Sequence, residues 1–267
     1  MPTTTELSGQ VALVTGAGRG IGQAIALALA AAGARVALTA RSRDQLDETA
    51  ALIQQAGGQA LVFPADVTDQ SAVEAVVAAT VQHFGPPDLL VNNAGQASRE
   101  ATLWELGPDE WWRVLEVNVR GPLLCARAVL PPMLARQSGR IINVASNAGT
   151  RPAPTASAYS VSKAALLRLT DCLAAETHGH GVSVFAISPG LVHTVMADAV
   201  SLFKDLPESE WTPRERAGEL CVFIATGQAD GFSGRYLHVD DDLGEMARRA
   251  GEIEQNDLYT LRVRRLE

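Results

Sequence analysis

A tyrosine and a lysine four residues apart are the side chains in this sequence best placed to do chemistry together. They lie in the segment Tyr159-Ser160-Val161-Ser162-Lys163, within a stretch of helical pattern. Residues at positions i and i+4 share one helix face. A free phenol has a pKa of about 10, and a cation within about 4–6 Å lowers the pKa of an acid by roughly 1–3 pH units. The pair therefore predicts a phenol suited to proton transfer. A solvated surface pair is the alternative.

Lysine is scarce in this chain, which favours the chemical interpretation of the pair. The 267 residues include 22 lysines and arginines, and only Lys163 and Lys204 are lysines. An ammonium group offers three donors on a flexible stem, whereas arginine is the residue that this chain otherwise uses. Lys163 is therefore expected to be required for its own chemistry.

A glycine-rich loop follows the apolar run at residues 11–15. Gly16, Gly20 and Gly22 are spaced G-x-x-x-G-x-G, and a helical pattern starts at Ile21. Glycine permits the unusual φ values of a tight strand-to-helix turn and lets a diphosphate approach the backbone. The following helix N-terminus offers free N–H groups to an anion. The loop therefore predicts a dinucleotide site, with an ordinary tight turn as the alternative.

Arginines surround the end of the second predicted strand. No acidic residue occurs between Gln23 and Arg43, where an NAD-selective site would place one to bind the ribose 2′-hydroxyl. Arg19 and Arg41 are instead suited to a 2′-phosphate, which rewards guanidinium contacts. These residues predict NADP(H) over NAD(H), unless the arginines are merely solvated.

The elements that must position these residues alternate along the chain. Short apolar runs predict strands at residues 11–15, 35–40, 60–63, 89–92, 140–144, 182–187 and 235–239. Helical patterns lie at residues 21–32, 44–55, 71–84, 109–136, 157–178 and 213–226. Gly121-Pro122 should kink the long helix. Alternation of strands and helices predicts an α/β fold, a single-domain Rossmann-like doubly wound parallel sheet of about seven strands with helices on both faces.

Five motifs in this order resemble the short-chain dehydrogenase/reductase family, from about Gly9 to Val239. They are the glycine loop, Asp66-Val67 after the third strand, Asn92-Asn93-Ala94-Gly95 after the fourth, the tyrosine–lysine pair, and Ser188-Pro189-Gly190 after the sixth. The resemblance implies hydride transfer between a nicotinamide and a carbonyl or alcohol carbon. The cofactor carries that chemistry, and the protein supplies orientation and electrostatics.

The family pattern gives roles to four catalytic candidates. The resemblance implies that Tyr159 gives or takes the proton and that Ser146, thirteen residues earlier, holds the substrate oxygen. Lys163 would hold the ribose and lower the phenol pKa, and Asn118 would fix a water that extends the proton relay. For Ser146 and Asn118 the alternative is a polar group with an ordinary structural partner.

The remaining cofactor-binding candidates come from the same resemblance. Asp66 is expected to contact the adenine, together with the backbone of Val67, although an aspartate here also suits a turn cap. The full predicted set is Gly16, Arg19, Gly20, Ile21, Gly22, Arg41, Asp66, Val67, Asn92, Tyr159, Lys163, Pro189, Val192 and Thr194. An Asx turn is the alternative for the asparagine motif.

The C-terminal end departs from the family pattern. Many members end the seventh strand with an Asp-Gly-Gly turn, whereas this chain has Asp240-Asp241-Asp242. We expect one domain over residues 1–240 and a charged extension over 241–267 that forms an interface or a lid. We expect a homodimer or a homotetramer, and this departure from the family pattern puts the tetramer in doubt.

Composition limits the other partners. The net charge of −8 argues against nucleic acid, whose readers carry a basic excess. The start has no leader pattern and no run spans a bilayer, which predicts a cytoplasmic protein without a membrane partner. Cys125, Cys172 and Cys221 are expected to be buried thiols in a reducing compartment. His178-x-His180 has no further ligands beside it, so no metal is expected.

The function expected from these observations is that of an NADP(H)-dependent carbonyl reductase or alcohol dehydrogenase. Its candidate substrates are 3-oxoacyl thioesters, small ketones, sugars and steroids. The rival function is an NADP(H)-binding sensor or regulatory protein without turnover, which would not need all four catalytic candidates.

Overall fold

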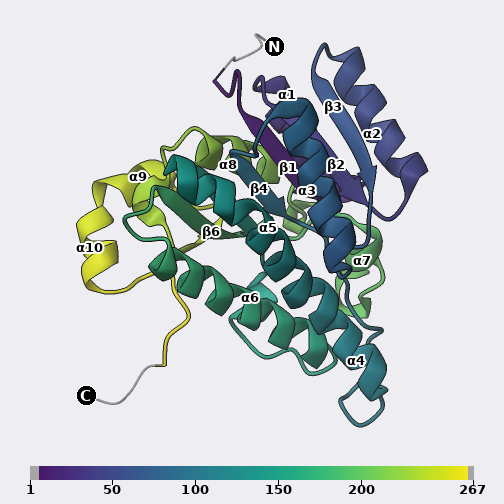
Figure 1. The fold of residues 1–267 in the computed structure, drawn as a ribbon. Coiled ribbons are helices and arrows are strands. Elements are labelled where there is room, and N and C mark those ends of the chain that lie inside the picture. Colours follow the sequence, from purple (N-terminus) through teal and green to yellow (C-terminus); the bar gives the residue numbers. More distant parts are fainter. Residues whose placement is uncertain (1–5, 264–267) are drawn as a thin grey trace.

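Seven parallel strands form one sheet in the computed structural model, which describes residues 6–263 (Figure 1). The strand order is β3-β2-β1-β4-β5-β6-β7. The strands are β1 Val11–Thr15, β2 Arg35–Ala40, β3 Gln59–Pro64, β4 Leu89–Asn92, β5 Gly139–Val144, β6 Val182–Ser188 and β7 Tyr236–His238. Each predicted strand is present, with ends that differ by at most one residue. The predicted doubly wound α/β fold is confirmed.

Helices cover both faces of this sheet. They are α1 Gly20–Ala31, α2 Arg43–Gln55, α3 Gln70–Phe84, α4 Pro108–Leu115, α5 Gly121–Arg136, α6 Ser157–Glu176, α7 Val195–Asp198, α8 Glu215–Ala225, α9 Leu243–Arg248 and α10 Ala250–Gln255. Strand side chains alternate between the faces. Leu13 therefore packs with α3, α5 and α6, whereas Val14 packs with α1, α2 and α8. Figure 1 shows α3, α5 and α6 in front of the sheet.

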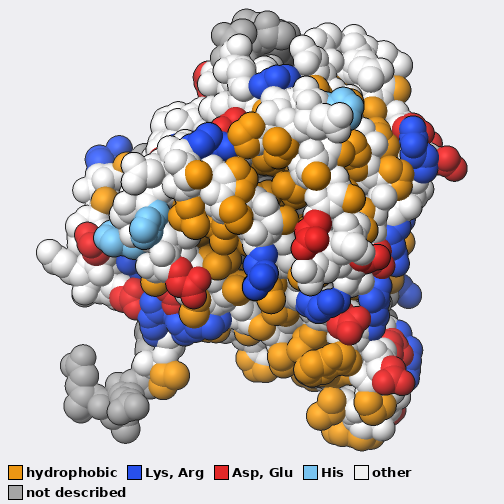
Figure 2. Space-filling view, viewed as in Figure 1, with side chains coloured by type: hydrophobic (Ala, Val, Ile, Leu, Met, Phe, Trp, Pro, Cys, Tyr) orange, Lys and Arg blue, Asp and Glu red, His pale blue; other side chains and the backbone are white. Residues whose placement is uncertain are grey.

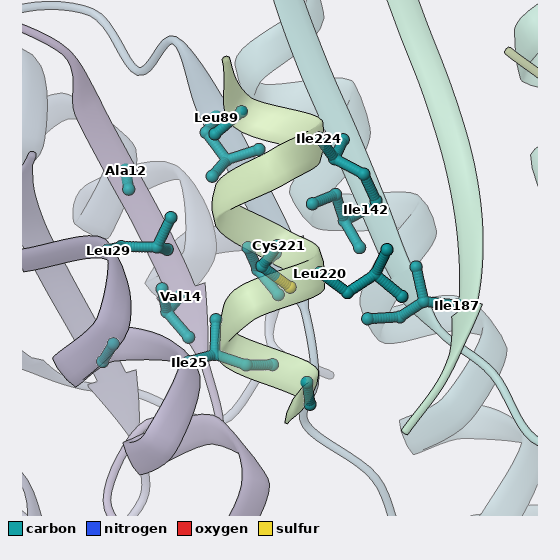
Figure 3. Packing of buried hydrophobic residues seen from close by; sticks show 14 of the residues in the cluster. Ala12, Val14, Ile25, Leu29, Leu89, Ile142, Ile187, Leu220, Cys221 and Ile224 are labelled. Carbon is teal, nitrogen blue, oxygen red and sulfur yellow. The ribbon is translucent and has the colours of Figure 1, made fainter. Parts of the chain in front are cut away.

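The core behind the sheet is closed by α8. Figure 3 shows Leu220, Cys221 and Ile224 of this helix between α1 and the strands. A Cβ on Gly218 would come within 2.6 Å of Ala28 Cβ, so the two helices approach closely because α8 has a glycine there. This packing holds the helix that starts in the glycine loop.

The long helix expected over residues 109–136 is divided differently from the prediction. A π-helical turn over Glu116–Arg120 separates α4 from α5, so the interruption comes before Gly121-Pro122. Such turns are frequent at functional sites. This one contains Asn118.

The C-terminal extension forms two helices that the sequence analysis did not predict. Met246 of α9 and Ile253 of α10 are buried in the same cluster as α1 and α8. Beyond them, the backbone N–H of Tyr236 in β7 donates to the Tyr259 carbonyl at 2.8 Å. The extension up to residue 263 therefore packs onto the domain, and residues 264–267 lie outside the described part. Its use as an interface or a lid stays a prediction.

One prediction about the cysteines is wrong. Cys125 and Cys221 are buried, but Cys172 is exposed because it lies on the solvent side of α6. All three are free thiols. Among residues 6–263, no helix is long and apolar enough to cross a membrane.

Candidate functional site

The predicted site residues gather at one edge of the sheet, where the parallel strands have their carboxyl ends. The chain leaves β1 at Thr15, β4 at Asn92, β5 at Val144 and β6 at Ser188. The order of strands reverses between β1 and β4. Ligands of open α/β sheets bind in the crevice at such a switch point.

The glycine loop between β1 and α1 is shaped so that side chains would not fit. Gly16 and Gly20 have φ values of +64° and +57°, which L side chains rarely adopt. A Cβ on Gly22 would lie 2.2 Å from the Gly16 carbonyl oxygen. Gly20 begins α1, and Ile21 is the second residue of the helix. The bare backbone and the helix N-terminus form a cradle that fits the diphosphate of a dinucleotide.

Asn93 holds this loop in place. Its Nδ2 donates to the carbonyl oxygens of Thr15 at 3.0 Å and Gly16 at 3.1 Å. The Thr15 hydroxyl accepts hydrogen bonds from the backbone N–H groups of Asn93 and Ala94, both at 3.0 Å. The predicted Asn92 is different: it is buried, and its Nδ2 donates to Asn143 Oδ1 at 2.9 Å. Contact of the Asn92 side chain with a cofactor therefore stays a prediction.

The loop after β6 approaches the glycine loop. A Cβ on Gly20 would meet Thr194 Cγ2 at 3.5 Å, which brings the predicted residue Thr194 against the glycine loop. The Thr194 hydroxyl caps α7 by accepting from the N–H of Ala197. Pro189 and Val192 are buried in the same loop. The loops that follow β1 and β6 therefore lie against each other at this edge of the sheet.

The arginines near the second strand differ in their partners. Arg43 pairs with Asp47 at 2.9 Å, one turn along α2. Arg19 and Arg41 are exposed, and neither has a side-chain partner within residues 6–263. Two guanidinium groups therefore remain available to an anion beside the glycine loop.

Asp66 already has protein partners. Its carboxylate accepts from the N–H and hydroxyl of Thr68, and Arg113 of α4 pairs with it at 3.0 Å. Burial raises the pKa of Asp66, but the Thr68 hydrogen bonds and Arg113 outweigh that effect and lower it. The turn-capping alternative thus holds for this side chain, and its adenine contact stays a prediction. Val67 is buried against Gly121.

Tyr159 and Lys163 lie on one face of α6, as the spacing predicts. Lys163 Nζ lies 5.5 Å from the centroid of the Tyr159 ring. The ammonium group is buried, and it donates to the Val144 carbonyl oxygen of β5 at 2.7 Å. A Cβ on Gly95 would lie 3.9 Å from Nζ, so the loop after β4 also approaches the ammonium group.

Burial has the largest effect on the pKa values of both Tyr159 and Lys163. It lowers the pKa of Lys163 to about 8, since an ammonium group loses its hydration there. Burial also raises the pKa of Tyr159, while hydrogen bonding with the Ser146 side chain opposes that rise. The lowering of the Tyr159 pKa by Lys163 stays a prediction.

Ser146 starts the tight turn Asn147–Gly149 after β5. Its hydroxyl accepts from the Ala148 N–H at 3.2 Å. The turn packs directly on α6, because a Cβ on Gly149 would lie 2.7 Å from the Lys163 backbone. Ser146 is thereby held beside Tyr159, as the residue spacing in the family pattern implies.

Asn118 ties three elements together with its side chain. Its Oδ1 accepts from the Gln96 N–H, and its Nδ2 donates to the Gln96 carbonyl, both at 2.8 Å. Nδ2 also donates to the Ser162 hydroxyl at 2.9 Å. Ser162 in turn donates to the Tyr159 carbonyl. The side chain positions the loop after β4 against α6, and a water relay through this residue stays a prediction.

Several residues of this site were not singled out from the sequence. Asn93 was predicted only as part of its motif, and no sequence pattern indicated Ser162, Asn147 or Tyr236. Ser162 lay inside the tyrosine–lysine segment, which was the one signal for it. The others are recognisable only from contacts between residues far apart in the chain.

The chain is similar to known proteins in both sequence and fold. Residues 10–205 match the family model described as short chain dehydrogenase. The chain is 37% identical to a 3-oxoacyl-[acyl-carrier-protein] reductase of Synechocystis sp., covering 88% of this chain and 97% of that protein. It is similar to NAD+-bound xylitol dehydrogenase, with TM-score 0.81, 31% identity and coverage of 87% and 98%. A variant of actinorhodin polyketide ketoreductase with NADPH gives TM-score 0.82, 33% identity and coverage of 90% and 98%.

Proposed function

This chain belongs to the short-chain dehydrogenase family, and we propose that it is an NADP(H)-dependent oxidoreductase acting on a carbonyl or secondary alcohol. The observation that carries the proposal is the buried ammonium group of Lys163, 5.5 Å from the Tyr159 ring at the carboxyl edge of the sheet. A buried charge without a carboxylate partner is costly, so a functional use is the physical reason to retain it.

The cradle residues would hold the cofactor. Gly16, Gly20 and Gly22 leave room for the diphosphate, and Arg19 and Arg41 provide positive charge for a 2′-phosphate. When bound, the nicotinamide supplies or accepts the hydride. The carboxylate of Asp66 is already paired with Arg113. Residues 23–43 contain no acidic side chain that could bind a ribose 2′-hydroxyl, which supports NADP(H) over NAD(H).

Tyr159 acts as the proton donor or acceptor in this proposal. Its raised pKa keeps the phenol protonated at neutral pH, which suits donation of a proton to a carbonyl oxygen being reduced. Ser146 orients that oxygen through its hydroxyl. Lys163 holds the ribose and stabilises the phenolate left after the transfer.

The substrate class is proposed by analogy with the relatives. The matches include a 3-oxoacyl-[acyl-carrier-protein] reductase and a polyketide ketoreductase, which favours 3-oxoacyl thioesters and related ketones. We also propose a cytoplasmic location, since three free thiols suit a reducing compartment.

A homodimer or homotetramer completes the proposal. Figure 2 shows hydrophobic side chains gathered at the lower end of the molecule, over α4. Leu103 and Trp104 in the turn before α4 and Trp112 of α4 are exposed. Exposed apolar patches of this kind mark interaction surfaces.

Consumption of NADPH against 3-oxoacyl thioesters, ketones, quinones and sugars tests the proposed activity. We expect turnover with at least one class, a preference for NADPH over NADH, and at least about a 10²-fold loss of kcat in Tyr159→Phe. NADPH binding without turnover across the panel would instead support the sensor function. A clear preference for NADH would contradict the cofactor assignment.

A further inference from the structure

Tyr236, which the proposed reaction does not use, reaches the same site from the last strand of the sheet. It pairs in register with Ala186 of β6, and its ring packs against Ala145 and Leu167. Ala145 immediately precedes Ser146. The ring therefore lies beside the turn that carries the predicted substrate-binding hydroxyl.

The Tyr236 hydroxyl is bonded to that turn. It donates to Asn147 Oδ1 at 2.8 Å, and Asn147 is the residue after Ser146. On its other side, the turn rests on the α6 backbone at Lys163 through Gly149. The turn is thus held between α6 and β7, and the hydrogen bond from Tyr236 is the contact that fixes it on the β7 side.

Tyr236 also lies next to the end of β6, from which the loop at Pro189 begins. Side chains two residues apart on a strand share a face, so Ser188 follows Ala186 on the face that Tyr236 covers. Burial raises the pKa of Tyr236 to about 12, whereas hydrogen bonding to the Ser188 side chain acts against that rise, and proximity to Tyr159 adds to it. The phenol therefore stays protonated at working pH and remains a donor. Ser188 directly precedes Pro189.

We propose that Tyr236 is a positioning residue that couples the turn carrying Ser146 to the loop that begins at Pro189. This inference rests on the proposed function, in which the first segment holds the substrate oxygen and the second carries the predicted cofactor-binding residues Pro189, Val192 and Thr194. Hydride transfer is sensitive to the relative placement of donor and acceptor. One hydroxyl between the two segments sets that placement without touching the reacting atoms.

Tyr236→Phe tests this role, with Tyr259→Phe as the matched control. Both changes remove one phenolic oxygen, and the contact of Tyr259 with β7 is made by its backbone carbonyl. We expect kcat of Tyr236→Phe to fall roughly tenfold, the scale of one lost buried hydrogen bond, with the KM for NADPH unchanged within about twofold. The primary deuterium isotope effect on kcat, measured with NADPH deuterated at the transferred position, should increase. Tyr259→Phe should match the wild type.

A double-mutant cycle with Asn147→Ala identifies the path of the effect. Because both changes remove the same hydrogen bond, their losses should not multiply. The inference is overturned if kcat of Tyr236→Phe is unchanged. It is also overturned if kcat falls while the isotope effect stays the same and the folded fraction decreases, or if the losses of the two variants multiply fully. A wild-type protein without turnover would contradict the proposed function itself, whereas an active wild type with an equally active Tyr236→Phe would overturn only the role of Tyr236.

Discussion

Lys163 carries a positive charge although only 4% of the residue's surface is exposed. Its described polar partner is the Val144 carbonyl oxygen, and no carboxylate pairs with it within residues 6–263. A carbonyl dipole compensates only part of the hydration that an ammonium group loses on burial. The residue therefore destabilises the fold while it prepares the site, a trade-off common among functional residues.

Replacement of this lysine should stabilise the protein. The fall of its pKa from 10.5 to about 8 corresponds to roughly 3 kcal/mol at neutral pH. We expect Lys163→Met to raise the free energy of unfolding by about 1–3 kcal/mol at pH 7 and to abolish turnover. Denaturant unfolding of both proteins measures the gain.

The pH dependence of that gain follows from the direction of the shift. Below pH 8 the lysine is charged in both states, so the folded state bears the full cost of burial. Between about pH 8 and 10.5 the folded lysine loses its proton while the unfolded one keeps it, so wild-type stability rises with pH. The difference between Lys163→Met and the wild type should shrink over this range. A constant difference from pH 7 to 10 would contradict the assignment.

The raised pKa of Tyr159 predicts different pH profiles for the two reaction directions. Reduction requires the protonated phenol, so its kcat/KM should be flat through neutral pH and fall only in alkali. Oxidation requires the phenolate, so its kcat/KM should increase with pH over the same range. Initial rates in both directions between pH 6 and 10 test this. A profile for reduction that falls already below neutral pH would be inconsistent with burial as the dominant effect.

At the scale of elements, short turns between strands and helices hold the site together. Asn93 fixes the glycine loop from the end of β4, and Asn118 fixes the following segment from the π-helical turn. The aspartates after β7 act in the same way: Asp242 caps α9, and Asp240 pairs with Arg216 of α8 at 2.8 Å. Asp241 accepts from the backbone N–H of His238, so each residue of the unusual Asp240-Asp241-Asp242 sequence has a structural partner.

Gly22→Ala should damage the cofactor cradle. Its Cβ would lie 2.2 Å from the Gly16 carbonyl oxygen and 2.3 Å from Asn93 Nδ2, so the loop must shift. We expect a loss of about 1–3 kcal/mol in stability and at least a tenfold weaker affinity for NADPH. Fluorescence titration and thermal unfolding measure the two effects. Gly251→Ala in α10 is the control, since nothing lies within 4 Å of its Cβ, and it should be neutral or slightly stabilising.

At the scale of the whole molecule, the C-terminal extension is part of the folded domain. Ile253 of α10 and Met246 of α9 join the core behind the sheet. Arg235, next to β7, pairs with Asp257 at 2.6 Å, and Arg168 of α6 donates to the Leu261 carbonyl. The extension thus supports the strand that carries Tyr236.

Ile253→Ala should therefore destabilise the whole domain. Loss of a buried isoleucine typically costs about 2–5 kcal/mol, from lost burial and the cavity left behind. Glu254→Ala, the exposed neighbour on the same helix, should stay within about 0.5 kcal/mol of the wild type. Thermal unfolding of the two variants measures the difference. Equal melting temperatures would show that the extension is not coupled to the core.

The sequence predicted the sheet well because its signals are local. Apolar runs of four to six residues mark the strands, and glycines mark where the chain leaves β1. The helices α9 and α10 were missed because each has only six residues and only one fully buried side chain, Met246 or Ile253, which is too short for a helical pattern. Cys172 was misplaced because the solvent side of α6 depends on what packs against the helix.

The sequence alone thus determined the features made by residues close together in the chain. These are the glycine loop, the lack of acidic residues around the second strand, and the shared helix face of Tyr159 and Lys163. Each depends on residues within a few positions of one another, whose spacing fixes their geometry. Only the tertiary structure decided the direction of the Tyr159 pKa, the partners of Asn118 and the contact of Tyr236 with Asn147. Burial and hydrogen bonds between residues up to 89 positions apart determine these properties, and they exist only once the sheet has brought the strands together.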